Sequence, residues 1–88
     1  MREFIYEVKD PMGFHARPAS RLFMKAREFD CRIEIATKGE TADGKNLLAL
    51  MGLGIREGEV LRFRFDGSDE EEAEKALKEV LAQIDLDL

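Results

Sequence analysis

Hydrophobic and polar residues alternate along four stretches of the chain, as they do in strands with one buried face. The first stretch covers residues 3–9, and the third is a short one over 40–42 that follows a turn at Lys38-Gly39 and completes a hairpin. We therefore expect four strands, each with one polar face. Their inward positions are Phe4, Tyr6 and Val8 in the first strand, Cys31, Ile33 and Ile35 in the second, and Leu61, Phe63 and Phe65 in the fourth.

Three other stretches have the spacing of helices. The first helix begins near Pro18. Proline has no backbone N–H, but N–H groups in the first turn of a helix have no partner within the helix, so none is lost there. The second covers 47–53, between Asn46 as N-cap and Gly54 as a left-handed end. The third follows Ser68, which has the capping-box spacing to Glu71. The apolar faces are Ala19, Leu22, Phe23 and Ala26 in the first helix, and Ala73, Ala76, Leu77, Val80, Leu81 and Ile84 in the third.

The predicted order is therefore β-α-β-β-α-β-α. Strands with one polar face favour an antiparallel sheet that is covered by helices on one side only, which defines an α+β fold. The chain has 88 residues, enough for one core but too few for a second, so we expect a single domain over residues 1–88.

Composition excludes several classes of function. The net charge of −5 argues against general nucleic-acid binding, and no apolar run approaches the roughly 20 residues of a membrane span. The fourth strand lacks clustered outward-facing aromatics for base stacking, because Phe63 and Phe65 point inward, and no CxxC pair indicates a metal site. The single cysteine, Cys31, is expected in the core, which suits a reducing compartment. With no signal-peptide pattern at the N-terminus, we expect a cytoplasmic protein.

The only histidine, His15, lies directly before the start of the first helix. A helix N-terminus presents unpaired N–H groups, here beginning with that of Ala16, and a partial positive charge that attracts anions. Arg17 can place a guanidinium at the same spot, where its planar fork matches phosphate oxygens. The positive helix end disfavours imidazolium by roughly 0.3–1 kcal/mol, so we expect a largely neutral, nucleophilic ring. The alternative is an exposed cap histidine without a role; Arg21, one turn on, either shares this face or is an ordinary surface residue.

Two segments carry a resemblance to a known family: Gly13-Phe14-His15-Ala16-Arg17-Pro18-Ala19, and Lys45-Asn46-Leu47-Leu48-Ala49-Leu50-Met51-Gly52-Leu53-Gly54-Ile55. At this spacing they resemble the histidine-containing phosphocarrier family HPr of the bacterial sugar phosphotransferase system, and the similarity extends over nearly the whole chain. The resemblance implies an open-faced β-sandwich, with a four-stranded antiparallel sheet and three helices on one face. It also implies a covalent carrier rather than an enzyme, without metal or cofactor.

The resemblance further implies how a phosphoryl group would move. His15 would receive it on Nδ1 from phosphorylated enzyme I, which is charged by phosphoenolpyruvate, and would pass it to the IIA component of a sugar permease. Arg17 would steady the group, and Pro18 would mark the helix start. The partners would then be enzyme I and IIA, and we expect the chain itself to be a monomer. Some paralogues are instead regulatory binding modules or act in a nitrogen-linked relay, and the sequence separates these poorly from transport carriers.

The chain departs from the family in two features: the residue that opens the second helix, and the basic rim near that helix. Many Gram-positive members have a serine there that a dedicated kinase phosphorylates, whereas Asn46 keeps the capping role but has no hydroxyl. We expect such a kinase to leave residue 46 unmodified, which mass spectrometry would check. The family's basic rim is also incomplete, because Arg27 and Lys45 are retained but Met24 and Ala49 are apolar.

The second helix carries more apolar side chains than so short a helix can bury. We expect one side to enter the core and the other to form an exposed patch beside the histidine that meets partner proteins. Two alternatives stay open: part of the patch is also buried, and Lys45 flanks the helix cap instead of meeting an acidic partner. The core side is Leu50 and Leu53, and the patch is Leu47, Leu48 and Met51, with Leu47 and Met51 as the residues that the first alternative would bury.

Overall fold

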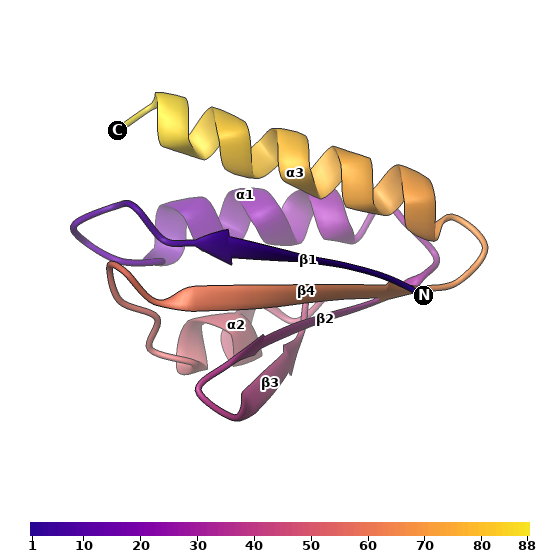
Figure 1. The fold of residues 1–88 in the computed structure, drawn as a ribbon, viewed down its shortest axis with the longest axis horizontal. Coiled ribbons are helices and arrows are strands. Elements are labelled where there is room, and N and C mark those ends of the chain that lie inside the picture. Colours follow the sequence, from indigo (N-terminus) through magenta and orange to yellow (C-terminus); the bar gives the residue numbers. More distant parts are fainter.

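The computed structural model describes residues 1–88 and has four strands and three helices in the predicted order. The chain begins with strand β1, and helix α1 separates it from the β2–β3 hairpin; α2 then leads into β4, and α3 ends the fold (Figure 1). The bounds are β1 Arg2–Glu7, α1 Ala16–Ala26, β2 Arg32–Thr37, β3 Glu40–Asp43, α2 Leu47–Gly52, β4 Val60–Asp66 and α3 Glu70–Leu86.

The strands form one antiparallel sheet in the order β1-β4-β2-β3. Phe63 of β4 is opposite Phe4 on one side and Ile35 on the other, so the apolar positions of three strands share one face. The rings of Phe4 and Phe63 stack with centroids 4.7 Å apart. Lys38 and Gly39 both have positive φ, 53° and 78°, and make the tight turn that was expected between β2 and β3.

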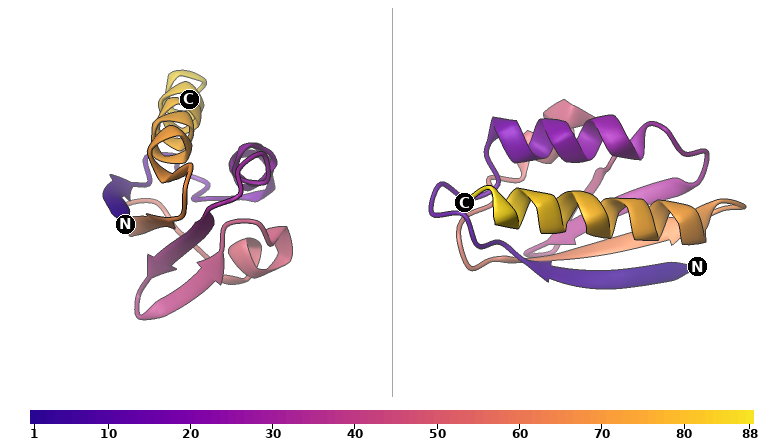
Figure 2. Two further views of the ribbon diagram at one scale, coloured as in Figure 1. Left: turned by 90° about the vertical axis from the view of Figure 1, so that its right-hand side faces the viewer. Right: turned by 90° about the horizontal axis from the view of Figure 1, so that it is seen from above.

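All three helices lie on the same side of the sheet, and the other face is open (Figure 2). Helix α3 packs on β1 and β4, while α1 contacts both α3 and α2. The core between these layers contains 19 buried apolar residues, among them Leu22 of α1, Phe65 of β4 and Leu77 of α3. The open-faced α+β sandwich expected from the sequence is confirmed.

The start of α3 differs from the prediction. Its N-cap is Asp69 rather than Ser68, and no side chain makes a capping hydrogen bond. The Asp69 carboxylate instead accepts the N–H groups of Asp30 at 2.8 Å and Cys31 at 2.9 Å, on the segment that leads into β2. Glu70, not Glu71, reaches back to the N–H of Gly67 at 3.0 Å. The predicted capping box is therefore wrong, because bonds to a distant segment replace the local one.

Candidate functional site

A tight turn between β1 and α1 sets the position of the histidine. The N–H of Gly13 donates to the carbonyl of Asp10 at 2.8 Å, and the N–H of Phe14 donates to the carbonyl of Ile55 at 3.0 Å. Gly13 has a φ of 72°, and a Cβ there would collide with the Ile55 carbonyl, so only glycine fits. The chain is thus anchored on both sides of the turn before it enters the helix.

His15 is the N-cap residue of α1, with extended backbone (φ −77°, ψ −174°) and no capping bond from its side chain. About a third of this side chain is exposed, at 29%, so the ring is reachable from solvent. Its Nε2 atom lies 3.1 Å from Oδ2 of Asp10. The ring is therefore held by a neighbour and is not a freely rotating surface group.

Asp10 is a site residue that the sequence analysis missed. Its Oδ1 atom accepts the N–H of Met12 at 2.9 Å, and this hydrogen bond, helped by His15, holds the pKa of the carboxyl below its usual value. An aspartate two residues before a turn amide is the pattern of an Asx-turn, and that signal is present in Asp10-Pro11-Met12-Gly13. The sequence analysis considered only positive neighbours of the ring, whereas this carboxylate is a negative one.

His15 and Arg17 line one cavity of about 500 Å³. Arg17 is exposed and takes no part in the ion pairs of the chain, while the other walls come from the turn and from the end of α3. Ala16 and Arg17 are the first two residues of α1, so their N–H groups have no carbonyl one turn back within the helix. Pro18 follows in the same turn, as expected. The geometry supplies a ring, a guanidinium without an acidic partner, and the positive end of a helix.

Arg21 lines the same cavity but has its own partner. Its Nη1 donates to Oδ2 of Asp87 at 2.8 Å, on the residue that ends α3. This pair joins the middle of α1 to the C-terminal end of α3. Of the two arginines in the cavity, Arg17 is therefore the one available to an anion.

Helix α2 divides its apolar residues largely as expected. Leu50 and Leu53 are buried, and Leu48 and Met51 are exposed by 84% and 43%. Leu47 is half-buried and packs against the core, which favours the alternative interpretation for that residue. The N-cap is Asn46, whose Oδ1 accepts the N–H of Ala49 at 3.0 Å.

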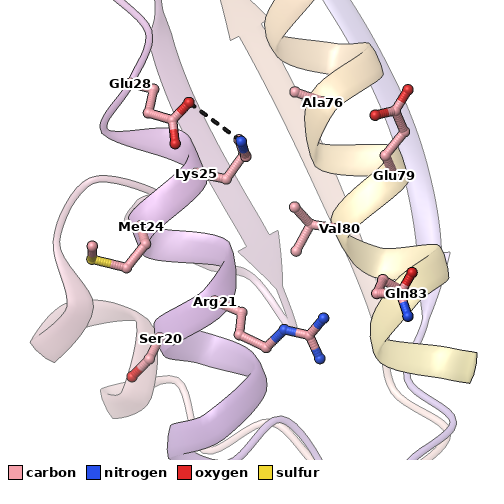
Figure 3. Close-up of a pocket in the computed structure, with 9 residues that line it drawn as sticks. All are labelled: Ser20, Arg21, Met24, Lys25, Glu28, Ala76, Glu79, Val80 and Gln83. Carbon is pink, nitrogen blue, oxygen red and sulfur yellow. Dashed lines mark hydrogen bonds and ion pairs between the residues drawn. The ribbon is translucent and has the colours of Figure 1, made fainter. Parts of the chain in front are cut away.

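Of the two cations expected in the basic rim, only Arg27 has an exposed side chain. Lys45 is half-buried and its ammonium donates to the backbone carbonyl of Phe29, which favours a structural role for this side chain. Arg27 is exposed, with its guanidinium 5.5 Å from the centre of the Phe23 ring. Met24 is exposed and points away from α3, whereas Arg21 points toward it (Figure 3).

A second groove, of about 520 Å³, lies between α1 and α3 (Figure 3). Its wall includes the Lys25–Glu28 ion pair, 3.3 Å long, and the apolar side chains of Met24 and Val80. It contains no histidine, cysteine or unpaired cation beside a helix N-terminus. The chemistry of the molecule is therefore concentrated in the cavity of His15.

No group of three or more histidine, cysteine or carboxylate side chains is arranged to hold a metal ion. None of the helices combines the length and the hydrophobicity that a membrane crossing needs.

Cys31 is a free, buried thiol, as the sequence predicted.

A histidine that opens a helix, with a guanidinium two residues later that pairs with no acidic side chain, defines an anion site beside a nucleophilic ring. Comparison with known proteins identifies the family. Residues 2–83 match the family of the phosphotransferase-system HPr component phosphorylation site. The chain belongs to this family, and its function is that of an HPr phosphocarrier of the phosphotransferase system.

Similar proteins support this assignment over almost the full length. The chain is 42% identical over 82 residues to the phosphocarrier protein HPr of Mycoplasma genitalium, covering 92% of this chain and 93% of that one. It is 40% identical over 81 residues to HPr of Lysinibacillus sphaericus, covering 92% of both. A solved structure of the histidine-containing phosphocarrier protein from Mycoplasma superposes with a TM-score of 0.92 at 29% identity, covering 94% of each chain.

Proposed function

We propose that this chain carries a phosphoryl group on His15, which it accepts from phosphorylated enzyme I and passes to the IIA component of a sugar permease. The observation that carries the proposal is that the ring shares its cavity with Arg17, the arginine there that has no acidic partner. Because the donor takes its group from phosphoenolpyruvate, a cytoplasmic metabolite, the proposed location is the cytoplasm.

The site has opposite preferences before and after transfer. Before transfer, the positive helix end and the guanidinium of Arg17 attract an approaching phosphoryl group to the accessible ring. After transfer, the N–H groups of Ala16 and Arg17 and the guanidinium of Arg17 can hold the new dianion by charge-assisted hydrogen bonds. Phosphoryl transfer needs little more than positioning and electrostatic stabilisation, which these groups supply.

The proposed docking surface is formed by Leu48 and Met51 with the exposed part of Leu47. Exposed apolar side chains that gather on one helix indicate a protein-binding site. The two partners would use this surface in turn, because each must bring its own reactive group to the same histidine. Asn46 caps the helix that carries this surface, so its side chain has a structural role in the proposed interface.

The test mixes the protein with enzyme I and phosphoenolpyruvate and measures acid-labile phosphate. We expect labelling of the wild type and none of His15→Ala. Arg17→Ala should slow labelling by about 100-fold, because one stabilising donor of the transferring group is lost. Arg32→Ala, at the exposed first position of β2, is the matched control and should label at the wild-type rate. Equal labelling of His15→Ala and wild type would contradict the proposal.

A further inference from the structure

The carboxylate of Asp10 is fixed in place by atoms outside the histidine. Its Oδ1 accepts the N–H of Met12 at 2.9 Å, and its backbone carbonyl accepts the N–H of Gly13 at 2.8 Å. Only 17% of the side chain is exposed. The remaining oxygen, Oδ2, therefore has a set direction, and it points at Nε2 of His15 at 3.1 Å.

This arrangement constrains which ring nitrogen carries hydrogen. An ionised carboxylate is an acceptor only, whereas each nitrogen of a neutral imidazole is either a donor or an acceptor. A nitrogen 3.1 Å from such an oxygen must donate, so Nε2 keeps its hydrogen. In the neutral ring the lone pair is then on Nδ1. The hydrogen bond made by one ring nitrogen thus determines the state of the other.

We propose that Asp10 is a positioning residue that holds the hydrogen of His15 on Nε2 and so reserves Nδ1 as the phosphoryl acceptor. This inference rests on the proposed function of His15 and adds to it the residue that selects the reactive nitrogen. Carboxylates that orient metal-binding histidines act in the same way, and there the loss of the carboxylate costs about 10–100-fold in affinity or activity.

The transfer step balances with this assignment. The lone pair of Nδ1 forms a bond to phosphorus, while the bond from phosphorus to the donor atom breaks and its electron pair leaves with the donor. The hydrogen on Nε2 stays in place, so the ring of the product is positively charged beside the attached dianion. The Asp10 carboxylate faces that charge through a hydrogen bond that becomes charge-assisted. The same contact therefore selects the nitrogen and stabilises the charge formed by the transfer.

Asp10→Asn separates this role from a structural one. Asparagine forms the same Asx-turn as aspartate, with its amide oxygen in the position of Oδ1 and accepting the N–H of Met12. The amide NH₂ then faces Nε2 of His15 and donates to it. The turn is kept, but the ring is driven to the opposite tautomer, with hydrogen on Nδ1.

Asp43→Asn is the matched control. Asp43 makes the same kind of turn before α2, because its Oδ1 accepts the N–H of Lys45 at 2.8 Å and its carbonyl accepts the N–H of Asn46 at 2.9 Å. No histidine lies near that turn, since His15 is the only one in the chain. Any general effect of the substitution on an Asx-turn should appear in both variants.

The experiment combines ¹⁵N NMR of the ring with phosphorylation by phosphoramidate, a small donor that needs no docking surface and releases ammonia. We expect hydrogen on Nε2 in wild type and Asp43→Asn, and a shift toward Nδ1–H in Asp10→Asn. The rate of phosphorylation should fall by about 10–100-fold in Asp10→Asn alone. The proposal requires both changes, and either one without the other overturns it. Failure of wild type to accept phosphate from enzyme I would refute the proposed function instead, and the NMR result would still decide which nitrogen Asp10 controls.

Discussion

Several side chains at the residue scale are placed by contacts outside their own helix or strand. Asp69 begins α3, yet its carboxylate receives the N–H groups of Asp30 and Cys31. Those hydrogen bonds, that of Asp30 first, hold the pKa of the Asp69 carboxyl below its usual value. Burial, together with this nearby carboxylate, raises the pKa of the Cys31 thiol to about 11.

Cys31 should accordingly be slow to react with thiol reagents in the folded protein. At about pH 8 a thiol with a pKa of about 11 is roughly one part in 1,000 thiolate, against roughly one in ten at its ordinary value of 9.0. The thiolate fraction alone predicts labelling about 100-fold slower than in the unfolded chain, and burial adds to this. Labelling with an aromatic disulfide reagent, with and without denaturant, measures the ratio. Equal rates would show that the thiol is exposed and unperturbed.

Helix α2 is the element whose surface position has the clearest functional consequence. Leu48 is the most exposed large apolar residue of the chain, at 84%, so its replacement removes no core contact. Leu48→Asp should reduce the rate of phosphoryl transfer from enzyme I by about tenfold or more, because it places a charge in the proposed apolar interface. Thermal unfolding should stay near that of the wild type. Both quantities can be measured on the same preparation.

Ile5→Asp provides the control for this substitution. Ile5 is also exposed and apolar, but it lies in β1 opposite Arg62 of β4, where a new carboxylate meets a cation across the strands. We expect normal transfer from this variant. If both variants transferred at the wild-type rate, the α2 surface would not be the docking site.

The helices and strands could be predicted because their sequence patterns are local. The contacts between these elements could not be predicted, because they join residues that are far apart in the sequence. Asn46 caps α2 as expected, since the bond to Ala49 spans only three residues. The Arg21–Asp87 pair joins residues 66 apart, and no sequence pattern indicates it. The Asp10–His15 contact could have been predicted, because the Asx-turn fixes the Asp10 carboxylate only five residues before the histidine. It was missed because the aspartate was read only as part of a turn.

One acidic cluster of the molecule, in the first turn of α3, lies far from the site. The net charge is −5, and the first turn of α3 contains Glu70, Glu71 and Glu72. The cavity of His15 is lined by Ile84 and Asp87, at the opposite end of the same helix. A helix of 17 residues is roughly 25 Å long, which exceeds the Debye length of about 10 Å at 0.1 M salt. The acidic turn therefore has little influence on an approaching partner at the histidine.

Docking of enzyme I should consequently depend little on salt. Near the proposed surface, Lys45 is held by the carbonyl of Phe29, and Met24 and Ala49 carry no charge, so electrostatic steering has few cations to act on. We expect the second-order rate constant of phosphoryl transfer to fall by less than about threefold between about 50 mM and 500 mM NaCl. The double variant Met24→Lys/Ala49→Lys should transfer faster at low salt and lose that gain at high salt, because steering by added cations is screened. A steep salt dependence in the wild type would mean that Arg17 and Arg27 alone attract the partner and that apolar contact is secondary.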